Sequence, residues 1–452
     1  MALAISSVLP AFAGGFVTNT NQSVSFFRMP AQEGAVSIDA AYFNPAAIGF
    51  LDNGFKLGFN WEAAQQTRQS KTDYAPLAYG NANGGNSSKL YKGVASAPFI
   101  PSLDLAYVHD NWFISDHFGL TGGGGKANYA DGLGSFESQI AGLAAIVNQG
   151  LPGTTYGVDM YLNGAQYTFS NQIMGGYLLN DHLSLSAGVR MSYIMASYDA
   201  EIKNITLSNA ALGPAPLPAS AFLTAIGQGA YAPMVADRKL DCKQTGMGFA
   251  PIVSLDFKTE KINIGIKYEF KTKVRLENST EINTSGLAQF DDQVKTGADI
   301  PAMFAAGIGY APVKKLHLYA SYHLFDDKHA ETYNSATGLN DKQDLLEGNT
   351  TEYLCGIEYA ICNRLIISCG AQKTIQKTGP DHKFLSDMSF STSSTSAGAG
   401  AKLLLTDNLD LNVGYFQTFF DHVEKTTATT PATTEDFFRT SQAFGAGINF
   451  RF

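Results

Sequence analysis

Apolar and polar side chains alternate strictly in many stretches of this chain from residue 53 onward. A period of two is typical of a β-strand with one apolar face. The first clear stretch, 55–62, reads Phe-Lys-Leu-Gly-Phe-Asn-Trp-Glu. Further stretches with this pattern lie at 98–109, 116–126, 165–179, 182–204, 246–258, 260–276, 302–311, 315–326, 350–361, 364–375, 396–405, 408–420 and 441–452. The pattern therefore predicts about fourteen strands.

The stretch 260–276 is the most informative, because it is far longer than the roughly five or six residues of a usual soluble strand. Its apolar residues are expected to face one way: Ile262, Ile264, Ile266, Tyr268, Phe270 and Val274. Its polar residues, among them Lys267, Lys271, Lys273 and Arg275, are expected to face the other way.

The connections between these stretches alternate in length. Tight turns are predicted at 180–181, 259–260, 311–314, 362–363 and 406–408, and long loops at 67–97, 127–164, 205–245, 277–300, 327–349, 376–395 and 421–440. Short turns at one end and long loops at the other are typical of an outer-membrane β-barrel. The fold class that we predict is all-β, a transmembrane antiparallel barrel with short helices in its extracellular loops.

Composition narrows the classes of protein that remain. The chain has 452 residues, 16% of them charged, and a formal net charge of −9, which is too acidic for a general nucleic-acid binder. No run of about 18 charge-free apolar residues lies beyond the N-terminus, which excludes a helical membrane bundle. The Gly125-Lys126 pair lacks the rest of a phosphate loop, and no zinc-protease or nucleophile-elbow motif is present, so we expect no cofactor, no metal and no enzyme activity.

The first 48 residues differ from the rest. Residues 1–13 are uncharged and apolar and end in Ala-Phe-Ala, as before a signal-peptidase cut, although the basic start of a signal peptide is missing. Either the true start lies upstream, or this stretch is a membrane-facing arm. Residues 14–48 show little alternation, and Pro45 cannot donate to a ladder. They suit a plug inside the lumen of a barrel formed by residues 49–452, since a barrel of this size is otherwise open to water.

Two of the long loops carry apolar residues at helical spacing. These are Phe136, Ile140, Leu143 and Val147 in loop 127–164, and Phe222, Leu223 and Ile226 in loop 205–245. The short helices could pack on each other as a lid, or they could form an apolar landing site. The two interpretations are compatible.

Glycines interrupt the third predicted strand at Gly119, Gly122, Gly123, Gly124 and Gly125. Glycine weakens a strand interior and marks bulges and bends. The run is therefore either a bend in the wall or only the exit of the strand into its loop.

A carboxylate ligand would need cations in the lumen, since an unpaired buried charge costs about several kcal/mol. The candidates are Lys271, Lys273 and Arg275, together with Arg190 on a nearby strand. The alternative is that these residues are ordinary lumen charges. Cys355 and Cys369 are equidistant from the turn at Cys362, so they could lie directly opposite each other, as a disulfide or as two small thiols at the lipid surface. His317 and His323 are interpreted as wet lumen residues.

The segment before the first strand carries a resemblance to a known family. It contains Glu33-Gly34, Asp39 and Asn44-Pro45-Ala46, and the last strand ends in Phe452. This resembles the hatch segment of the FadL/TodX family of outer-membrane transporters for long-chain fatty acids and other hydrophobic compounds. The resemblance implies a 14-stranded barrel plugged by a hatch, capture of ligand at apolar extracellular loops, and a lateral gate where the third strand kinks, here at Gly119–Gly125.

The resulting functional hypothesis is ATP-independent transport of hydrophobic molecules, most readily long-chain fatty acids, across the bacterial outer membrane. The expected partners are the ligand, outer-membrane lipid and the barrel assembly machinery, for a monomer that binds no nucleic acid. A general diffusion porin, a barrel hydrolase and a secreted β-sandwich adhesin are the alternatives. Neither the ligand nor its chain length follows from the sequence.

Overall fold

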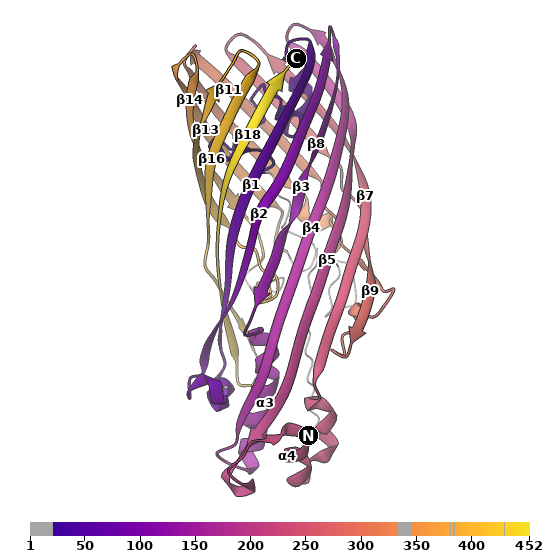
Figure 1. Ribbon diagram of the computed structural model, residues 1–452, viewed down its shortest axis with the longest axis vertical. Coiled ribbons are helices and arrows are strands. Elements are labelled where there is room, and N and C mark those ends of the chain that lie inside the picture. The colour runs from indigo at the N-terminus through magenta and orange to yellow at the C-terminus, as the bar shows by residue number, and fades with distance from the viewer. Residues whose placement is uncertain (1–20, 333–345, 380, 383–384, 429) are drawn as a thin grey trace.

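A computed structural model describes residues 21–332, 346–379, 381–382, 385–428 and 430–452. The signal segment predicted at 1–13 and the start of the predicted plug lie outside these residues. The described strands form one closed antiparallel barrel, long in one direction, with short turns at one end and helices at the other (Figure 1).

Eighteen strand segments pair in chain order, and β1 closes the barrel by pairing with β18. Three wall strands are each interrupted and consist of two segments: β8 with β9, β10 with β11, and β16 with β17. β6 has only two residues and is not a wall strand, so the wall has fourteen strands. The predicted fold class is thereby confirmed. The strands are β1 Gly54–Asp73, β2 Ser88–His109, β3 Trp112–Tyr129, β4 Thr155–Asn180, β5 Leu183–Ser208, β6 Leu217–Pro218, β7 Arg238–Lys258, β8 Ile262–Glu269, β9 Arg275–Asn283, β10 Lys295–Gly297, β11 Met303–Val313, β12 Leu316–Phe325, β13 Thr350–Cys362, β14 Leu365–Ile375, β15 Ser394–Leu404, β16 Leu409–Phe420, β17 Val423–Thr427 and β18 Thr433–Arg451.

Several strands continue well past their predicted ends. β1, β2, β4 and β5 extend toward the long loops, and Figure 1 shows them continuing downward below much of the wall. Alternation marks a strand only where one face is apolar and the other polar. These extensions are mixed on both faces, so the sequence pattern does not reveal them.

The outward face of the wall is apolar. Large exposed side chains alternate with buried ones along each strand. Exposed aromatic residues lie near the short turns: Tyr107, Trp112, Tyr177, Phe257, Tyr310 and Tyr359. A ring of aromatic side chains at the edge of an apolar band is typical of a barrel that spans a membrane. No helix in the described part of the chain has the length and apolarity needed to cross one.

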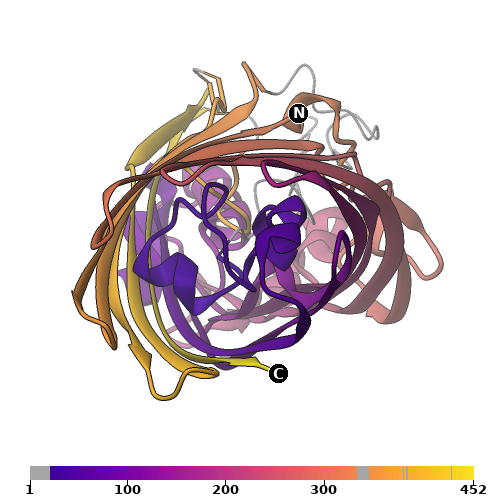
Figure 2. The same ribbon diagram turned by 90° about the horizontal axis from the view of Figure 1, so that it is seen from above.

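Residues 21–53, which we call the inner segment, lie inside the barrel near the end with the short turns (Figure 2). The inner segment contains α1 Val24–Arg28, α2 Ala40–Phe43 and the 3-10 helix η1 Pro45–Phe50. Ser23 caps α1 by accepting a hydrogen bond from the backbone N–H of Phe26. Helices suit this place because they satisfy their own backbone groups without a neighbouring strand.

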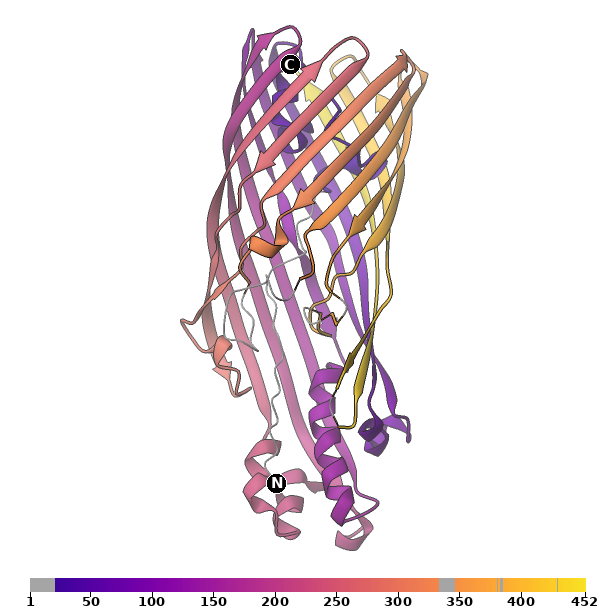
Figure 3. The same ribbon diagram turned by 180° about the vertical axis from the view of Figure 1, so that it is seen from behind.

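Helices α3 Gly134–Gly150 and α4 Ala219–Ala225 lie at the opposite end, where the long connections are (Figure 3). Short 3-10 helices accompany them in the connections: η2 Ala75–Tyr79, η3 Asn81–Asn83, η4 Ala210–Leu212, η5 Gly229–Val235, η6 Ala288–Phe290 and η7 Asp327–His329. The predicted loop helices at 136–147 and 219–226 therefore have their counterparts in the structure.

The prediction of one continuous strand over 260–276 is wrong. Because of the break, several side chains beyond it point to the opposite face from the one predicted. The strand breaks after Glu269 and resumes at Arg275. Lys267 and Glu269 face inward before the break, whereas Val274 is buried inside after it, so Lys273 and Arg275 point outward. A shift of one residue in a strand moves every following side chain to the other face.

The predicted juxtaposition of Cys355 and Cys369 is also wrong. Cys369 pairs across the ladder with Ile357, and Cys355 pairs with Ala371. The turn that joins β13 to β14 lies at 363–364 and is not centred on Cys362, so each thiol faces a residue two positions away from the other thiol. Both cysteines are free and exposed.

Candidate functional site

The ladder between β2 and β3 is interrupted in the middle of the wall. Pairing runs to Leu103 with Phe118 and resumes only at Ala95 with Ala127. Residues 96–102 of β2 and residues 119–122, 125 and 126 of β3, all of them described, have no register partner across this boundary. We call this opening the wall gap.

Local sequence explains why the ladder fails there. Pro98 and Pro101 on β2 have no backbone N–H to donate. On β3, Gly123 and Gly125 have φ of 103° and 69°, a left-handed conformation that side chains rarely adopt. Two register shifts against β4 accompany these glycines, one between Leu120 and Gly122 and the next between Gly122 and Gly125. The glycines that the sequence singled out, Gly119 to Gly125, thus form one edge of the wall gap.

A pocket of about 440 Å³ reaches the wall gap from the lumen. On the lumen side it is lined by Phe26 and Phe416, whose rings are 5.4 Å apart. It is also lined by Tyr167 and Phe169, which alternate along β4 with the buried inward residues Thr168 and Ser170 and so face outward. Because inward and outward residues line one cavity, the pocket passes through the wall.

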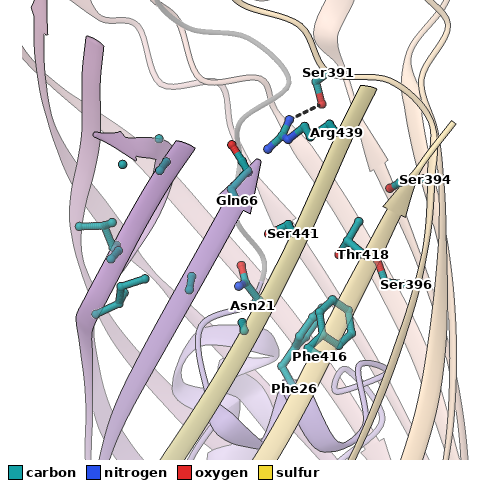
Figure 4. A pocket seen from close by; sticks show the side chains of 18 of the residues that line it. Asn21, Phe26, Gln66, Ser391, Ser394, Ser396, Phe416, Thr418, Arg439 and Ser441 are labelled. Atoms are coloured by element: carbon teal, nitrogen blue, oxygen red, sulfur yellow. Dashed lines mark hydrogen bonds between the residues drawn. The ribbon is translucent and has the colours of Figure 1, made fainter. Parts of the chain in front are cut away.

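The other end of the pocket is polar and cationic. Arg439 and Ser391 lie far from the phenyl rings of Phe26 and Phe416, with a hydrogen bond of 3.3 Å between them (Figure 4). Arg68 stands directly opposite Arg439 in the ladder of β1 with β18, on the same inward face. Neither guanidinium forms an ion pair with a carboxylate of the described residues. The pocket therefore has an aromatic end and a polar end lined by Arg439, with Arg68 as the ladder neighbour of Arg439.

The inner segment is held against the wall by backbone contact. A Cβ placed on Gly34 would lie 2.3 Å from the backbone nitrogen of Gly309, and one on Gly265 would lie 2.0 Å from the carbonyl oxygen of Glu33. No side chain fits at either distance, so glycine is required on both surfaces. Asn44 adds hydrogen bonds to the Glu33 carbonyl and to the carboxylate of Asp256.

Buried charges also join the inner segment to the wall. Nε2 of His323 lies 2.8 Å from Glu33 of the inner segment, and its Nδ1 lies 2.8 Å from Glu352, which lines the pocket. Ionised carboxylates only accept hydrogen bonds, so both ring nitrogens donate and the ring is an imidazolium. Arg28 makes a second link through Glu358, at 3.0 Å. His323 is therefore a dry ion-pair partner, which corrects its interpretation as a wet lumen residue.

The remaining predicted hatch residues have local roles. Asp39 accepts hydrogen bonds from Ser25 and Ser37 within the inner segment. Pro45 begins η1, where its missing N–H costs nothing, and the backbone N–H of Ala46 donates to Ser254 of the wall at 2.8 Å.

Replacing Glu33 with Gln should loosen the inner segment. Removing one partner of a buried ion pair costs about 3–5 kcal/mol, because the other charge is left unpaired. We expect the Glu33→Gln barrel to fold but its inner segment to be cut faster by protease added to the purified protein. Ser37→Ala is the control, since that hydroxyl binds only within the inner segment. Equal protection of both variants would contradict an anchoring role for His323.

The apolar residues predicted in the loop helices are mostly buried. Ile140, Leu143 and Val147 of α3 share one core cluster with Phe222 and Leu223 of α4, and Ile226 packs against it in part. Packing as a lid accounts for these residues, while Phe136 lines a separate small cleft of about 50 Å³ with Leu162, Tyr198, Leu240, Leu287, Phe290 and Met388.

Helix α3 is also fixed by a buried carboxylate, Glu137. It accepts hydrogen bonds from Asn83, Lys89, Tyr91 and Tyr156 at 2.6–2.8 Å. Burial alone would raise the pKa of Glu137, but the hydrogen bonds from Lys89, Tyr91 and Asn83 hold it below its ordinary value.

The four cations proposed for a ligand head group do not form one site. Arg190 is buried but pairs with Glu269 at 2.7 Å. Arg275 points outward and binds Asp299 and Glu331, and Lys271 donates to the carbonyl oxygen of His329. Arg190, Lys271 and Arg275 are thus already paired within the fold, and Lys273 points outward.

Sequence reasoning missed Arg68 and Arg439, because each lies beyond the clear alternation, in the extended part of its strand. It also missed Glu352, which lines the pocket, His323, which binds Glu352, and Glu62, which lines a neighbouring small cavity. The prolines at 98 and 101 were a usable signal, since proline inside a strand indicates a missing ladder bond.

The described strands form a closed fourteen-stranded barrel whose lumen holds the inner segment. No family pattern and no curated protein sequence matches this chain. Among solved structures it is similar to a Pseudomonas aeruginosa FadL homologue (14% identity, TM-score 0.66, covering 97% of this chain and 100% of the other). It is also similar to the P. putida toluene transporter TodX (14%, 0.56, 92% and 95%) and the Ralstonia pickettii toluene transporter TbuX (14%, 0.54, 95% and 98%). The chain therefore has the FadL/TodX fold, and the predicted resemblance is confirmed at the level of the fold.

Proposed function

We propose that this chain is an outer-membrane channel that carries hydrophobic small molecules inward by ATP-independent diffusion, with long-chain fatty acids as its ligand class. The observation that carries the proposal is the pocket that joins the lumen to the outward face at the wall gap. Solved proteins of this fold are described as toluene transporters, which supports a hydrophobic cargo. A general porin needs an open polar lumen, whereas the inner segment occupies this one.

The proposed route has three stages. Ligand is captured at the extracellular end, among α3, α4 and the cleft beside Phe136. It then moves into the pocket and leaves sideways through the wall gap into the bilayer. The segment 14–48 serves as a hatch that prevents a straight aqueous path, and its ion pairs through Glu33 and Arg28 support that role.

The surroundings follow from the same proposal. The apolar outward face contacts outer-membrane lipid, and the last strand, which ends in Phe452, is read by the barrel assembly machinery. We propose that the protein works as a monomer, without cofactor or catalytic step.

The head group of a fatty acid would lie at Arg68 and Arg439 rather than at the cations that sequence reasoning selected. A carboxylate that leaves water needs donors to replace it. Arg439 lines the pocket, stacks over Phe420 at 4.3 Å and carries a buried Nε without a hydrogen-bond partner. The acyl chain would then extend toward Phe26 and Phe416.

Replacing both Arg68 and Arg439 with Met tests this proposal. Charge-assisted hydrogen bonds contribute about 1.5–3 kcal/mol each, so oleate binding should weaken about tenfold or more. Methyl oleate, which has no charge, should bind nearly as before. Both affinities are measured by displacement of a fluorescent lipid from the purified protein.

Lys273→Met with Arg275→Met is the matched control, because these cations point outward, and it should change neither affinity. Equal losses for oleate and methyl oleate in the Arg68 and Arg439 variant would show that the arginines support the barrel only. No binding of either ligand to the unaltered protein would remove fatty acids as the ligand class.

A further inference from the structure

Glu62 is a buried carboxylate without a partner. It lies on the inward face of β1, is 4% exposed, and its Oε1 has no hydrogen-bond partner. Four other buried carboxylates in the described part of the chain have an unpartnered oxygen, but each binds a neighbour through its second oxygen: Glu33, Asp104, Asp256 and Glu269. Glu62 makes no hydrogen bond or ion pair to any described residue.

A small cavity of about 30 Å³ lies beside this carboxylate. Its other walls are Asn21, Gln22, Ile100, Pro101, Ser102 and Leu120. Space of about 10–15 Å³ is enough for one water-sized group, so a hydroxyl group fits. The cavity shares Asn21, Ile100, Pro101 and Leu120 with the large pocket, so the two are neighbours.

The cavity also adjoins the wall gap. Ile100 and Pro101 belong to the unpaired part of β2, and Leu120 lies at the start of the unpaired part of β3. Glu62 is paired in the ladder with Ile100, directly before the register shift between β1 and β2. A molecule that occupies the aromatic end of the pocket or leaves through the gap therefore passes this carboxylate.

We propose that the small cavity is a subsite for the hydroxyl group of an uncharged hydrophobic molecule, an alcohol or a phenol, with Glu62 as the hydrogen-bond acceptor. This inference rests on the proposed function of the large pocket as a ligand pocket. An unmade hydrogen bond at a buried polar group is costly, and a hydroxyl donor removes that cost without adding a charge. No cationic side chain of the described residues lines this cavity, so an anionic group at this end would stay unpaired, and the subsite disfavours it.

The other side chains around the cavity also favour a ligand that brings its own hydrogen-bond donor. Ile100, Pro101 and Leu120 supply no donor side chain, and the hydroxyl of Ser102 already donates to the carbonyl oxygen of Gln22 at 2.7 Å. The side-chain amide of Gln22 donates to the carbonyl oxygen of Leu120 at 3.0 Å, and no described side chain that lines the cavity donates to Glu62. The donor that Glu62 lacks can therefore come from the bound molecule. This subsite is separate from the arginine pair, which lies six residues further along β1, about 20 Å away along the strand.

The test compares p-cresol with toluene, which differ by a single hydroxyl group, and 1-octanol with octane as the aliphatic pair. Affinities for the purified full chain are measured by calorimetry, with corrections for partition into detergent. In the unaltered protein we expect p-cresol to bind about tenfold tighter than toluene after this correction. Glu62→Leu should remove that preference while leaving toluene binding unchanged, and Glu62→Gln, which keeps an acceptor oxygen, should retain part of it.

Ser37→Ala is the control, since Ser37 lines neither the large pocket nor the small cavity, and the preference of this variant should equal that of the unaltered protein. A preference for p-cresol that persists in Glu62→Leu would overturn the subsite. Equal binding of p-cresol and toluene to the unaltered protein would overturn it too, while leaving the proposed function in place. If none of the four molecules binds, the subsite proposal fails, and binding of oleate then decides separately whether the large pocket is a ligand pocket. A preference confined to p-cresol or to 1-octanol would support the subsite and identify which of the two classes it takes.

Discussion

Deleting residues 21–40 should turn a nearly closed barrel into an open pore. The deletion removes α1, Glu33 and Gly34, and with them the ion pairs to Glu358 and His323. A lumen bounded by fourteen strands is wide enough for water and ions once nothing fills it. We expect a large, stable increase in single-channel conductance in planar bilayers, relative to the unaltered protein.

The matched control is a deletion of equal length at the other end, residues 211–230, which removes α4 and leaves the inner segment in place. It should leave conductance low. Heat-dependent migration on gels shows whether each variant forms a folded barrel. A folded 21–40 deletion with unchanged, near-zero conductance would contradict the proposal that this segment closes the lumen.

The barrel was predictable because the alternation that marks each wall strand lies within that strand's own sequence. Each wall strand needs an apolar face toward lipid, so alternation reveals it wherever the strand crosses the apolar band. The tight turns predicted at 180–181 and 362–363 are flanked by such strands and lie within one residue of the observed turns at 181–182 and 363–364. The extensions of β4 and β5 toward the long loops have no lipid to face, so nothing in their pattern separates them from loops.

The direction of side chains was less predictable than the strands that carry them. Between Phe270 and Thr272 the chain leaves the ladder for a short interval, with no glycine or proline to mark the break. Alternation counted across this interval placed Arg275 in the lumen, whereas the structure places it outside. A parity argument therefore holds only within one unbroken strand.

The charged network between the inner segment and the wall could not be predicted at all. Glu33 and His323 are 290 residues apart, and neither has a motif around it that indicates a partner. Their contact depends on which wall strand faces the inner segment and at what height. The pocket follows the same rule, because Arg439, Gln66 and Phe26 line one cavity only after closure of β1 on β18.

The second large effect is expected at the wall gap. Replacing Gly123 and Gly125 with Val should stop ligand from leaving the pocket sideways. Valine does not tolerate the positive φ that both glycines adopt, and a Cβ on Gly123 would lie 2.2 Å from the carbonyl oxygen of Gln166. The two bulges must therefore rearrange toward regular pairing, which valine favours.

Transfer of oleate into vesicles that contain the doubly substituted barrel should fall close to the rate of vesicles without protein. Binding of oleate to the purified variant should persist, since Arg68, Arg439, Phe26 and Phe416 are untouched. Gly164→Val is the control, because Gly164 lies in the regular ladder of β4, has open space for a side chain and has no positive φ. Lost transfer with retained binding locates the exit at the wall gap, whereas normal transfer through a folded double variant would place the exit elsewhere in the barrel.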